Sequence, residues 1–248
     1  MSITIKSIKG YYFLDVWIMA NIVQQATLAF CKSYLNRHND PCGRLYDQMT
    51  MAARSVTANI AEGCSRHQTS RETEMKLNDV ARASLSELLG DFFSLSLQMG
   101  CEPWPKHSVD YRKFTAIQLS PPQYSEDIEH DAWVHIQRER KKFAPWTECT
   151  ELSIRLNAMM LLINRNISML QKMIAGQLER FKQEGGFTEN LTQERVSTQR
   201  ELAVAQGAPS CSTCGKPMIR RMAKRGINAG HDFWSCSDYP NCQGTRNI

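Results

Sequence analysis

Four of the nine cysteines lie within the last 38 residues, at Cys211, Cys214, Cys236 and Cys242. Two cysteines separated by two residues form a turn that brings both thiolates to one ion, and a second pair completes a tetrahedron of sulfur ligands. Four thiolates favour zinc and leave no coordination position open for water. The spacing therefore predicts one structural zinc ion, which supplies the folding free energy that so short a segment lacks.

The other five cysteines are scattered along the chain, and the total is odd. They are Cys31, Cys42, Cys64, Cys101 and Cys149. An odd total with one tight cluster argues against a framework of disulfides. We expect these five to be small buried hydrophobes or free thiols.

A basic stretch and an aromatic stretch lie between and around the two cysteine pairs, separated by a glycine-containing turn. This order predicts a β-hairpin. Stacking of a base on an aromatic ring contributes ~1–3 kcal/mol, and arginine and lysine attract phosphates. We therefore predict nucleic-acid contacts at Arg220, Arg221, Lys224, Arg225, Phe233, Trp234, Tyr239 and Arg246. Alternatively, one or two of the three rings cover the zinc site.

The net charge of +5 is concentrated at the C-terminal end of the chain. Residues 211–248 contain six basic and two acidic side chains, whereas residues 1–210 contain 24 and 23. Such an asymmetry points to a polyanionic partner for the cysteine-rich segment. No apolar run approaches the ~20 residues that span a bilayer, so we expect a cytoplasmic protein without membrane contact.

Apolar residues recur at steps of three and four along four long segments of the first 184 residues. These segments are about 12–36, 43–62, 70–99 and 147–184. Four amphipathic helices joined mostly by short turns predict an all-α fold, an antiparallel four-helix bundle over residues 1–184. The stripes themselves are core positions.

Local signals set the expected helix ends. Gly63 is expected to stop the second helix in a left-handed conformation. Thr69 is expected to cap the third, with Glu72 reaching back. Asn59 and Glu62 either satisfy backbone groups near this turn or contact a ligand.

An insertion at about 101–146 separates the third and fourth helices. Four prolines make its first part a loop, and a charged accessory helix follows at about 125–142, ended by Pro145. Residues 185–210 are polar and predict a linker, helical in part. The small zinc module, residues 211–248, completes the chain.

Further residues around the four cysteines carry a family resemblance. The set is Cys211, Cys214, Gly215, Pro217, Met218, Gly226, Asn228, Ala229, Gly230, Phe233, Trp234, Cys236, Ser237, Tyr239, Pro240, Cys242, Gly244, Thr245 and Arg246. With it, residues 211–248 closely resemble the C4 zinc-finger modules that end bacterial type I DNA topoisomerases. The resemblance implies binding of single-stranded DNA. It does not imply topoisomerase activity, because the remaining residues leave no room for the cleavage domains of those enzymes.

A second set of residues lies in the predicted second and third helices. It comprises Ala52, Ala53, Ser55, Asn59, Ile60, Ala61, Glu62, Gly63, Arg66, Ser84, Leu85, Glu87 and Leu88. This set is similar to the signature of the bacterial four helix bundle proteins, which include proteins encoded in rRNA intervening sequences and the accessory variability determinant of diversity-generating retroelements. With its insertion and C-terminal finger, the chain looks like the four helix bundle suffix domain proteins. The resemblance implies a homo-oligomer, a pentamer, with nucleic acid and a reverse transcriptase as partners.

Two functions are consistent with these patterns. The first is a non-enzymatic nucleic-acid-binding protein, with DNA favoured over RNA, in which the zinc finger binds a single strand and the bundle assembles into an oligomer. The second is a scaffold or accessory factor that binds a protein such as a reverse transcriptase. We expect no enzyme, because the sequence shows no paired acids on one seam, no nucleophile–base arrangement and no phosphate loop.

Overall fold

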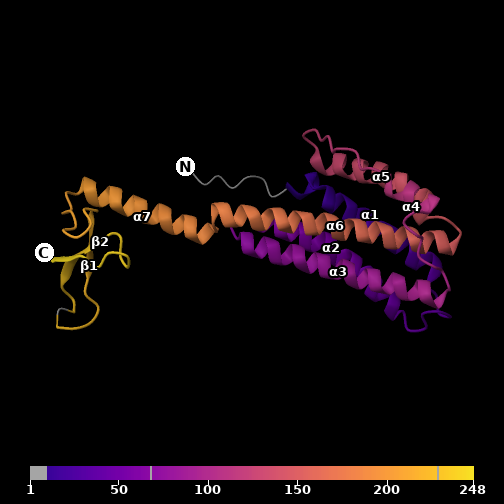
Figure 1. Ribbon diagram of the computed structural model, residues 1–248, viewed down its shortest axis with the longest axis horizontal. Helices are drawn as coiled ribbons and strands as arrows, with labels where there is room; N and C mark the ends of the chain where they lie inside the picture. The colour runs from indigo at the N-terminus through magenta and orange to yellow at the C-terminus, as the bar shows by residue number, and fades with distance from the viewer. Residues whose placement is uncertain (1–9, 68, 228) are drawn as a thin grey trace. The chain divides into compact units, whose positions relative to one another are not determined.

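The computed structural model describes residues 10–67, 69–227 and 229–248, and it divides the chain into two compact units. The first is Met1–Glu184 and the second is Gly185–Ile248. Most of the chain is helical, and a small antiparallel sheet lies in the second unit (Figure 1). Among the described residues, none of the helices combines the length and the hydrophobicity that a membrane span requires.

The described residues of the first unit form one short 3-10 helix and six α-helices. They are η1 (Gly10–Phe13), α1 (Asp15–Tyr34), α2 (Arg44–Arg66), α3 (Arg71–Gln98), α4 (Val109–Thr115), α5 (Ile128–Thr147) and α6 (Leu152–Glu184). Helix α2 packs against α1 and α3, and α6 packs against α3 and α1. Helix α5 contacts α1 and α6, and Figure 1 shows it on the other side of α6 from α3.

The apolar stripes of α1, α2, α3 and α6 meet in one continuous core. Phe30 of α1 and Phe92 of α3 are fully buried and meet edge to face, with ring centroids 5.0 Å apart. Burying a side chain of this size contributes ~1.5–3 kcal/mol. Because many such positions are buried along each helix, packing rather than helix propensity holds this unit together.

The turn between α2 and α3 differs from the expectation at both helix ends. Helix α2 continues through Gly63 to Arg66, and a Cβ at Gly63 would lie 3.2 Å from the Glu74 carbonyl oxygen. Gly63 is therefore a packing glycine that lets α3 approach closely. The cap of α3 is Ser70, not Thr69, because the Ser70 hydroxyl accepts a hydrogen bond from the Thr73 N–H at 3.2 Å.

The expected end of the accessory helix before Pro145 is also wrong, whereas Asn59 takes the first of its two expected roles. The Asn59 side chain donates to the Ser55 carbonyl at 2.9 Å, so it satisfies a backbone group of its own helix. Helix α5 runs past Pro145 to Thr147, and beyond the proline the Glu148 N–H donates to the Ala144 carbonyl at 2.9 Å, so the last turn is kept although Pro145 has no N–H to donate. Helix α6 consequently begins at Leu152, later than the sequence pattern indicates.

Polar contacts hold the insertion together and attach it to α6. The fully buried Glu139 carboxylate accepts hydrogen bonds from the Ser120 N–H at 3.0 Å and from Lys142 at 2.6 Å. The Arg165 guanidinium on α6 donates to the Ile117 carbonyl. These bonds satisfy groups that would be costly to bury alone, so the insertion is an integral part of the first unit.

The second unit begins with a helix and ends with a sheet. Its elements are α7 (Phe187–Ala205), β1 (Met218–Met222), β2 (Asp232–Cys236) and β3 (Thr245–Asn247), with strand order β1-β2-β3 and antiparallel pairing throughout. The predicted hairpin corresponds to β1 and β2, and β3 extends it. Asn228, in the predicted glycine turn, lies outside the described residues.

Candidate metal centre and the surrounding sheet

The four clustered cysteines come together in space. Their sulfur atoms all lie within 4.8 Å of one another, and among the described residues they are the one group of three or more Cys, His, Asp or Glu side chains arranged to hold a metal ion. The Cys211 and Cys242 sulfurs are 3.7 Å apart, and those of Cys214 and Cys236 are 3.4 Å apart. A disulfide needs about 2.05 Å, so these are four separate thiol ligands.

Tight turns place these sulfur atoms. Cys211 and Cys214 lie in a turn closed by a hydrogen bond from the Gly215 N–H to the Cys211 carbonyl at 2.9 Å. Gly215 has a φ of 73°, a left-handed conformation that glycine adopts without strain. Cys236 is the last residue of β2, and Cys242 directly follows the turn that ends at Asn241, three residues before β3.

Gly244 stands directly against the metal centre. A side-chain carbon at this position would collide with the Cys211 sulfur. The Gly244 carbonyl also accepts a hydrogen bond from the Cys236 N–H at 2.9 Å, which ties two ligand-bearing segments together. In the sequence Gly244 is only one residue of the zinc-finger resemblance, and the structure gives the steric reason for glycine.

The four thiols do not share one electrostatic environment. Backbone N–H groups of Thr213 and Cys214 lower the pKa of the Cys211 thiol to about 6. Burial raises the pKa of the Cys236 thiol to about 12. Four thiolates at these distances repel one another, so a bound cation is needed to hold all of them deprotonated.

Ion pairs and hydrogen bonds outside the four cysteines link α7 to the cysteine cluster. Asp238, between Cys236 and Cys242, forms ion pairs with Lys216 at 2.7 Å and with Arg200 of α7 at 3.0 Å. These partners, Lys216 first, lower the pKa of the Asp238 carboxyl. Arg200 also donates to the Ser237 hydroxyl at 3.0 Å, so residues 185–210 include a helix bound to the module. No local sequence signal indicates this pairing, which joins residues 38 positions apart.

The register of the sheet sorts the predicted contact residues onto two faces. On one face Arg220 is directly opposite Trp234, and Trp234 is directly opposite Arg246. Trp234 is half-buried against the cysteine cluster. The Arg220 guanidinium pairs with the Asp232 carboxylate at 2.6 Å.

The opposite face carries the other two rings. Arg221 is directly opposite Phe233, and its guanidinium lies 5.7 Å from the centre of the Tyr239 ring. Tyr239 is 57% exposed and Phe233 is half-buried. The remaining predicted residues, Lys224 and Arg225, follow β1 and are exposed. The eight residues therefore form two faces and a turn, not one patch.

The scattered cysteines show no common role. All five are free, and Cys31 alone among them is fully buried. Burial raises the pKa of the Cys31 thiol to about 12, so it behaves as a small apolar side chain. Cys42 is exposed, and the other three are partly exposed.

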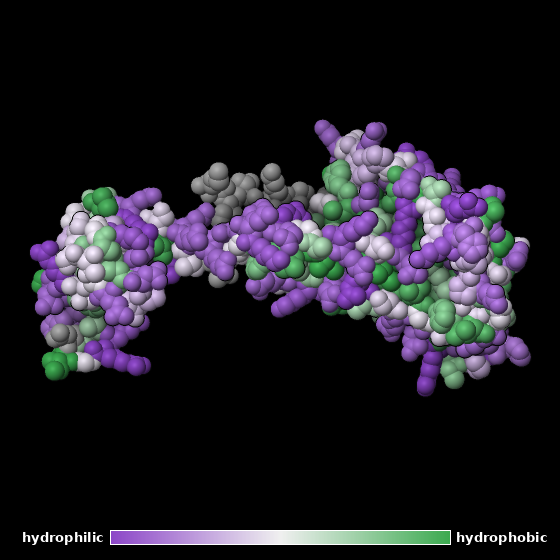
Figure 2. All heavy atoms as spheres, in the orientation of Figure 1, coloured by the Kyte–Doolittle hydropathy of each residue, from purple (hydrophilic) through white to green (hydrophobic). Residues whose placement is uncertain are grey.

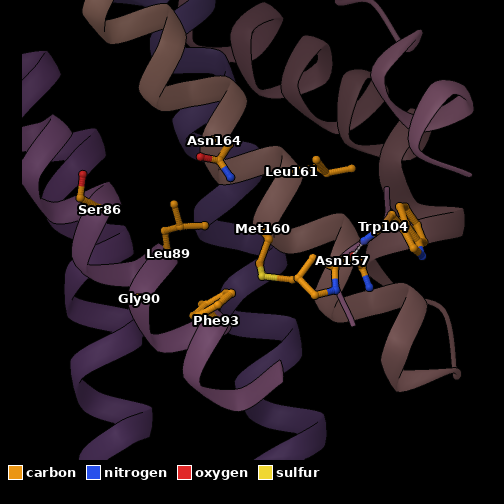
Figure 3. A pocket seen from close by; sticks show the side chains of 10 residues that line it. Ser86, Leu89, Gly90, Phe93, Trp104, Asn157, Met160, Leu161 and Asn164 are labelled. Atoms are coloured by element: carbon orange, nitrogen blue, oxygen red, sulfur yellow. Dashed lines mark hydrogen bonds between the residues drawn. The ribbon is translucent and has the colours of Figure 1, made fainter. Parts of the chain in front are cut away.

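A further candidate site in the first unit is an apolar groove between α3 and α6 of about 460 Å³ (Figure 3). Its walls include Leu89 and Phe93 of α3 and Met160 and Leu161 of α6. The Asn157 side chain accepts from the Trp104 N–H at 2.6 Å, which fixes one end of the groove. No ionisable side chain lines it, so the groove offers shape and apolar contact rather than acid–base chemistry.

A scan of protein-family models and searches of curated proteins and of solved structures found no match to the chain.

Proposed function

We propose that the chain is a non-enzymatic, zinc-dependent protein that binds single-stranded nucleic acid, DNA in preference to RNA, through its second unit. One observation carries the proposal: each aromatic residue of β2 lies directly across the sheet from arginine. Arg220 and Arg246 flank Trp234 on one face, and Arg221 faces Phe233 on the other. Ring and guanidinium together match an unstacked base and its phosphate.

Zinc is the metal that this donor set favours. Tetrahedral zinc with four sulfur ligands at about 2.3 Å places the sulfur atoms about 3.8 Å apart. The two sulfur pairs, Cys211 with Cys242 at 3.7 Å and Cys214 with Cys236 at 3.4 Å, fit that spacing after a small adjustment. All four positions are occupied by the chain's own cysteines, so the ion would hold Cys211, Cys214, Cys236 and Cys242 together and would perform no reaction. The free thiols throughout the chain are typical of a cytoplasmic protein.

Charge supports a polyanionic partner. The six basic and two acidic side chains of residues 211–248 give this segment +4, while residues 1–210 sum to +1. The sheet is therefore the part of the chain to which phosphates are attracted. Single-stranded rather than duplex nucleic acid fits, because the aromatic rings need unpaired bases to stack on.

The first unit provides the platform in this proposal. The mutual packing of α1, α2, α3 and α6 supports a four-helix bundle, and an oligomer, a pentamer by family resemblance, would present several second units to one strand. Tethering weak sites raises avidity by ~10²–10⁴. The groove between α3 and α6 favours a second role, as a scaffold that binds a protein helix such as one from a reverse transcriptase.

The test is the salt dependence of binding to a short single-stranded oligonucleotide by the full-length, zinc-loaded chain. We expect each arginine removed from the sheet, in Arg221→Gln or Arg246→Gln, to reduce the slope of log K against log salt by about 0.7. Arg195→Gln on α7 makes the same charge change away from the sheet and should leave the slope unchanged. An unmodified chain that binds no single strand would overturn the proposal.

A further inference from the structure

The two faces of the sheet differ in how far their side chains are engaged in contacts within the module. On the Trp234 face, the ring packs against the cysteine cluster and Arg220 is paired with Asp232. On the Phe233 face, the pairing register and the alternation of strand residues place Arg221, Phe233, Thr245 and Asn247 together. On the first face Trp234 and Arg220 are therefore engaged in holding the module, which leaves Arg246 to attract a phosphate, whereas the second face offers a ring and several polar side chains to a base.

A hollow of about 600 Å³ opens on the Phe233 face, between the end of β3 and the loop after β1. Hydrogen bonds from the Ala223 N–H to the His231 carbonyl at 3.0 Å and from the Gly230 N–H to the Ala223 carbonyl at 2.9 Å fold this loop into a wall. The volume lies within the range of small-ligand sites, about 300–1,000 Å³. The hollow is therefore large enough for a single nucleotide.

The lining chemistry matches a nucleobase. Phe233 supplies an aromatic ring, Asn247 and Thr245 supply an amide and a hydroxyl, and Arg225 and His231 supply cationic or polar nitrogen donors. A carboxamide offers a donor and an acceptor side by side, the arrangement that pairs with the edge of a base. Asp232 also lines the hollow, but its carboxylate is engaged by Arg220 at 2.6 Å.

We propose that this hollow is a nucleobase pocket, in which an unpaired base turned out of a single strand stacks on Phe233 and is read at its edge by Asn247. Arg225 neutralises the adjoining phosphate. The exposed Tyr239, held near Arg221, receives the neighbouring base on the same face. The inference rests on the proposed function and adds to it a defined face and a residue that sets base preference.

The test measures binding of the full-length, zinc-loaded chain to single-stranded oligonucleotides of adenine, of cytosine and of thymine. Phe233→Leu keeps an apolar side chain but removes the ring, and should weaken binding to all three by roughly 5- to 100-fold. Phe233→Tyr keeps the ring and should restore the affinity. The zinc content of each variant is measured, because a misfolded module would not retain the ion. If Phe233→Leu fails this control, the Tyr239→Ala variant of the same face takes its place in the comparison.

Asn247→Ala gives the decisive comparison. We expect it to reduce the differences in affinity among the three oligonucleotides, while Gln193→Ala on α7, another exposed carboxamide, leaves them unchanged. If the unmodified chain binds single strands but Phe233→Leu, Tyr239→Ala and Asn247→Ala all bind like it, the pocket is wrong and the proposed function stands. If the unmodified chain binds none of the oligonucleotides, the proposed function itself fails.

Discussion

The two units of the chain reach stability by different physical routes. The first, Met1–Glu184, buries a continuous apolar core along four long helices. In the second, Gly185–Ile248, the buried core is three cysteines and one methionine, with Trp234 packed against them. So small an apolar core cannot offset the conformational entropy of its chain. The first unit is therefore expected to fold without metal and the second to require it.

Removing the metal should have the largest effect, and it should affect one unit. Cys236→Ser, or a strong zinc chelator, removes a binding free energy of about 10–16 kcal/mol and should unfold the sheet. Because Arg200 of α7 is held by Asp238 and Ser237, α7 should lose its docking at the same time. Backbone NMR spectra measure this, because the amide resonances of the two units can be followed separately. Loss of resonances from α1, α2, α3 or α6 would contradict the separation.

The reciprocal change belongs in the helical core. Phe92 is fully buried, so Phe92→Ala should lower the free energy of unfolding of the first unit by about 3–5 kcal/mol. Zinc affinity of the second unit should be unchanged. Urea denaturation followed by helical circular dichroism measures the loss, with Trp133→Ala, at a site 63% exposed, as the control that should change little. A matching loss of zinc affinity in Phe92→Ala would show that the units fold together.

Acidification should weaken the first unit through His135. This side chain is 3% exposed, and burial lowers the pKa of its imidazole, opposed by Glu139 and assisted by Arg138. Because the folded pKa lies below the usual 6.5, the unfolded chain binds the proton more readily, and stability is lost as the pH falls below that value. The urea concentration at the midpoint of unfolding should differ less between about pH 5.5 and about pH 7.5 in His135→Asn than in the unmodified chain. His107→Asn, at an exposed position, should keep the difference.

Two glycines of the first unit should respond in opposite directions, with the smallest effects. Gly176 lies in α6 with open space around it, so Gly176→Ala should raise the free energy of unfolding by about 0.5–1 kcal/mol. Gly63→Ala gains the same helix propensity, but its methyl group would press against the Glu74 carbonyl of α3. The variant should therefore have a lower free energy of unfolding than the unmodified chain. Thermal unfolding of the two variants decides this. Equal stabilisation by both would mean that α2 and α3 are not closely packed at Gly63.

The periodicity of apolar residues and the spacing of the cysteines predicted the long helices and the cysteine cluster. Steps of three and four placed α1, α2, α3 and α6 because their apolar stripes are buried. The cysteine spacing predicted a cluster, and the four sulfur atoms do lie close enough together to hold a metal ion. Helix ends were less predictable. Thr69 and Ser70 have equivalent hydroxyls, and which one caps α3 depends on the path of the preceding turn.

Tertiary contacts had no local signal. The pairing of Arg200 with Asp238 joins a polar helix to the segment between Cys236 and Cys242, and nothing near either residue in the sequence indicates the other. The division of Trp234 and Phe233 between opposite faces follows from alternation once the strand is known, but which face covers the cysteines depends on the fold of the turns. Asn247 was not among the predicted contact residues, because the sequence pattern predicted a hairpin of two strands and not the third strand, β3.

The central claim is that a metal-dependent second unit, and not the helical unit, binds nucleic acid. Fluorescence anisotropy of a labelled single-stranded oligonucleotide, titrated with the full-length chain before and after zinc removal at one salt concentration, tests it directly. We predict that binding is lost on zinc removal and returns when zinc is restored, while the helical signal of the first unit stays constant. Undiminished affinity in the zinc-free chain would contradict the account.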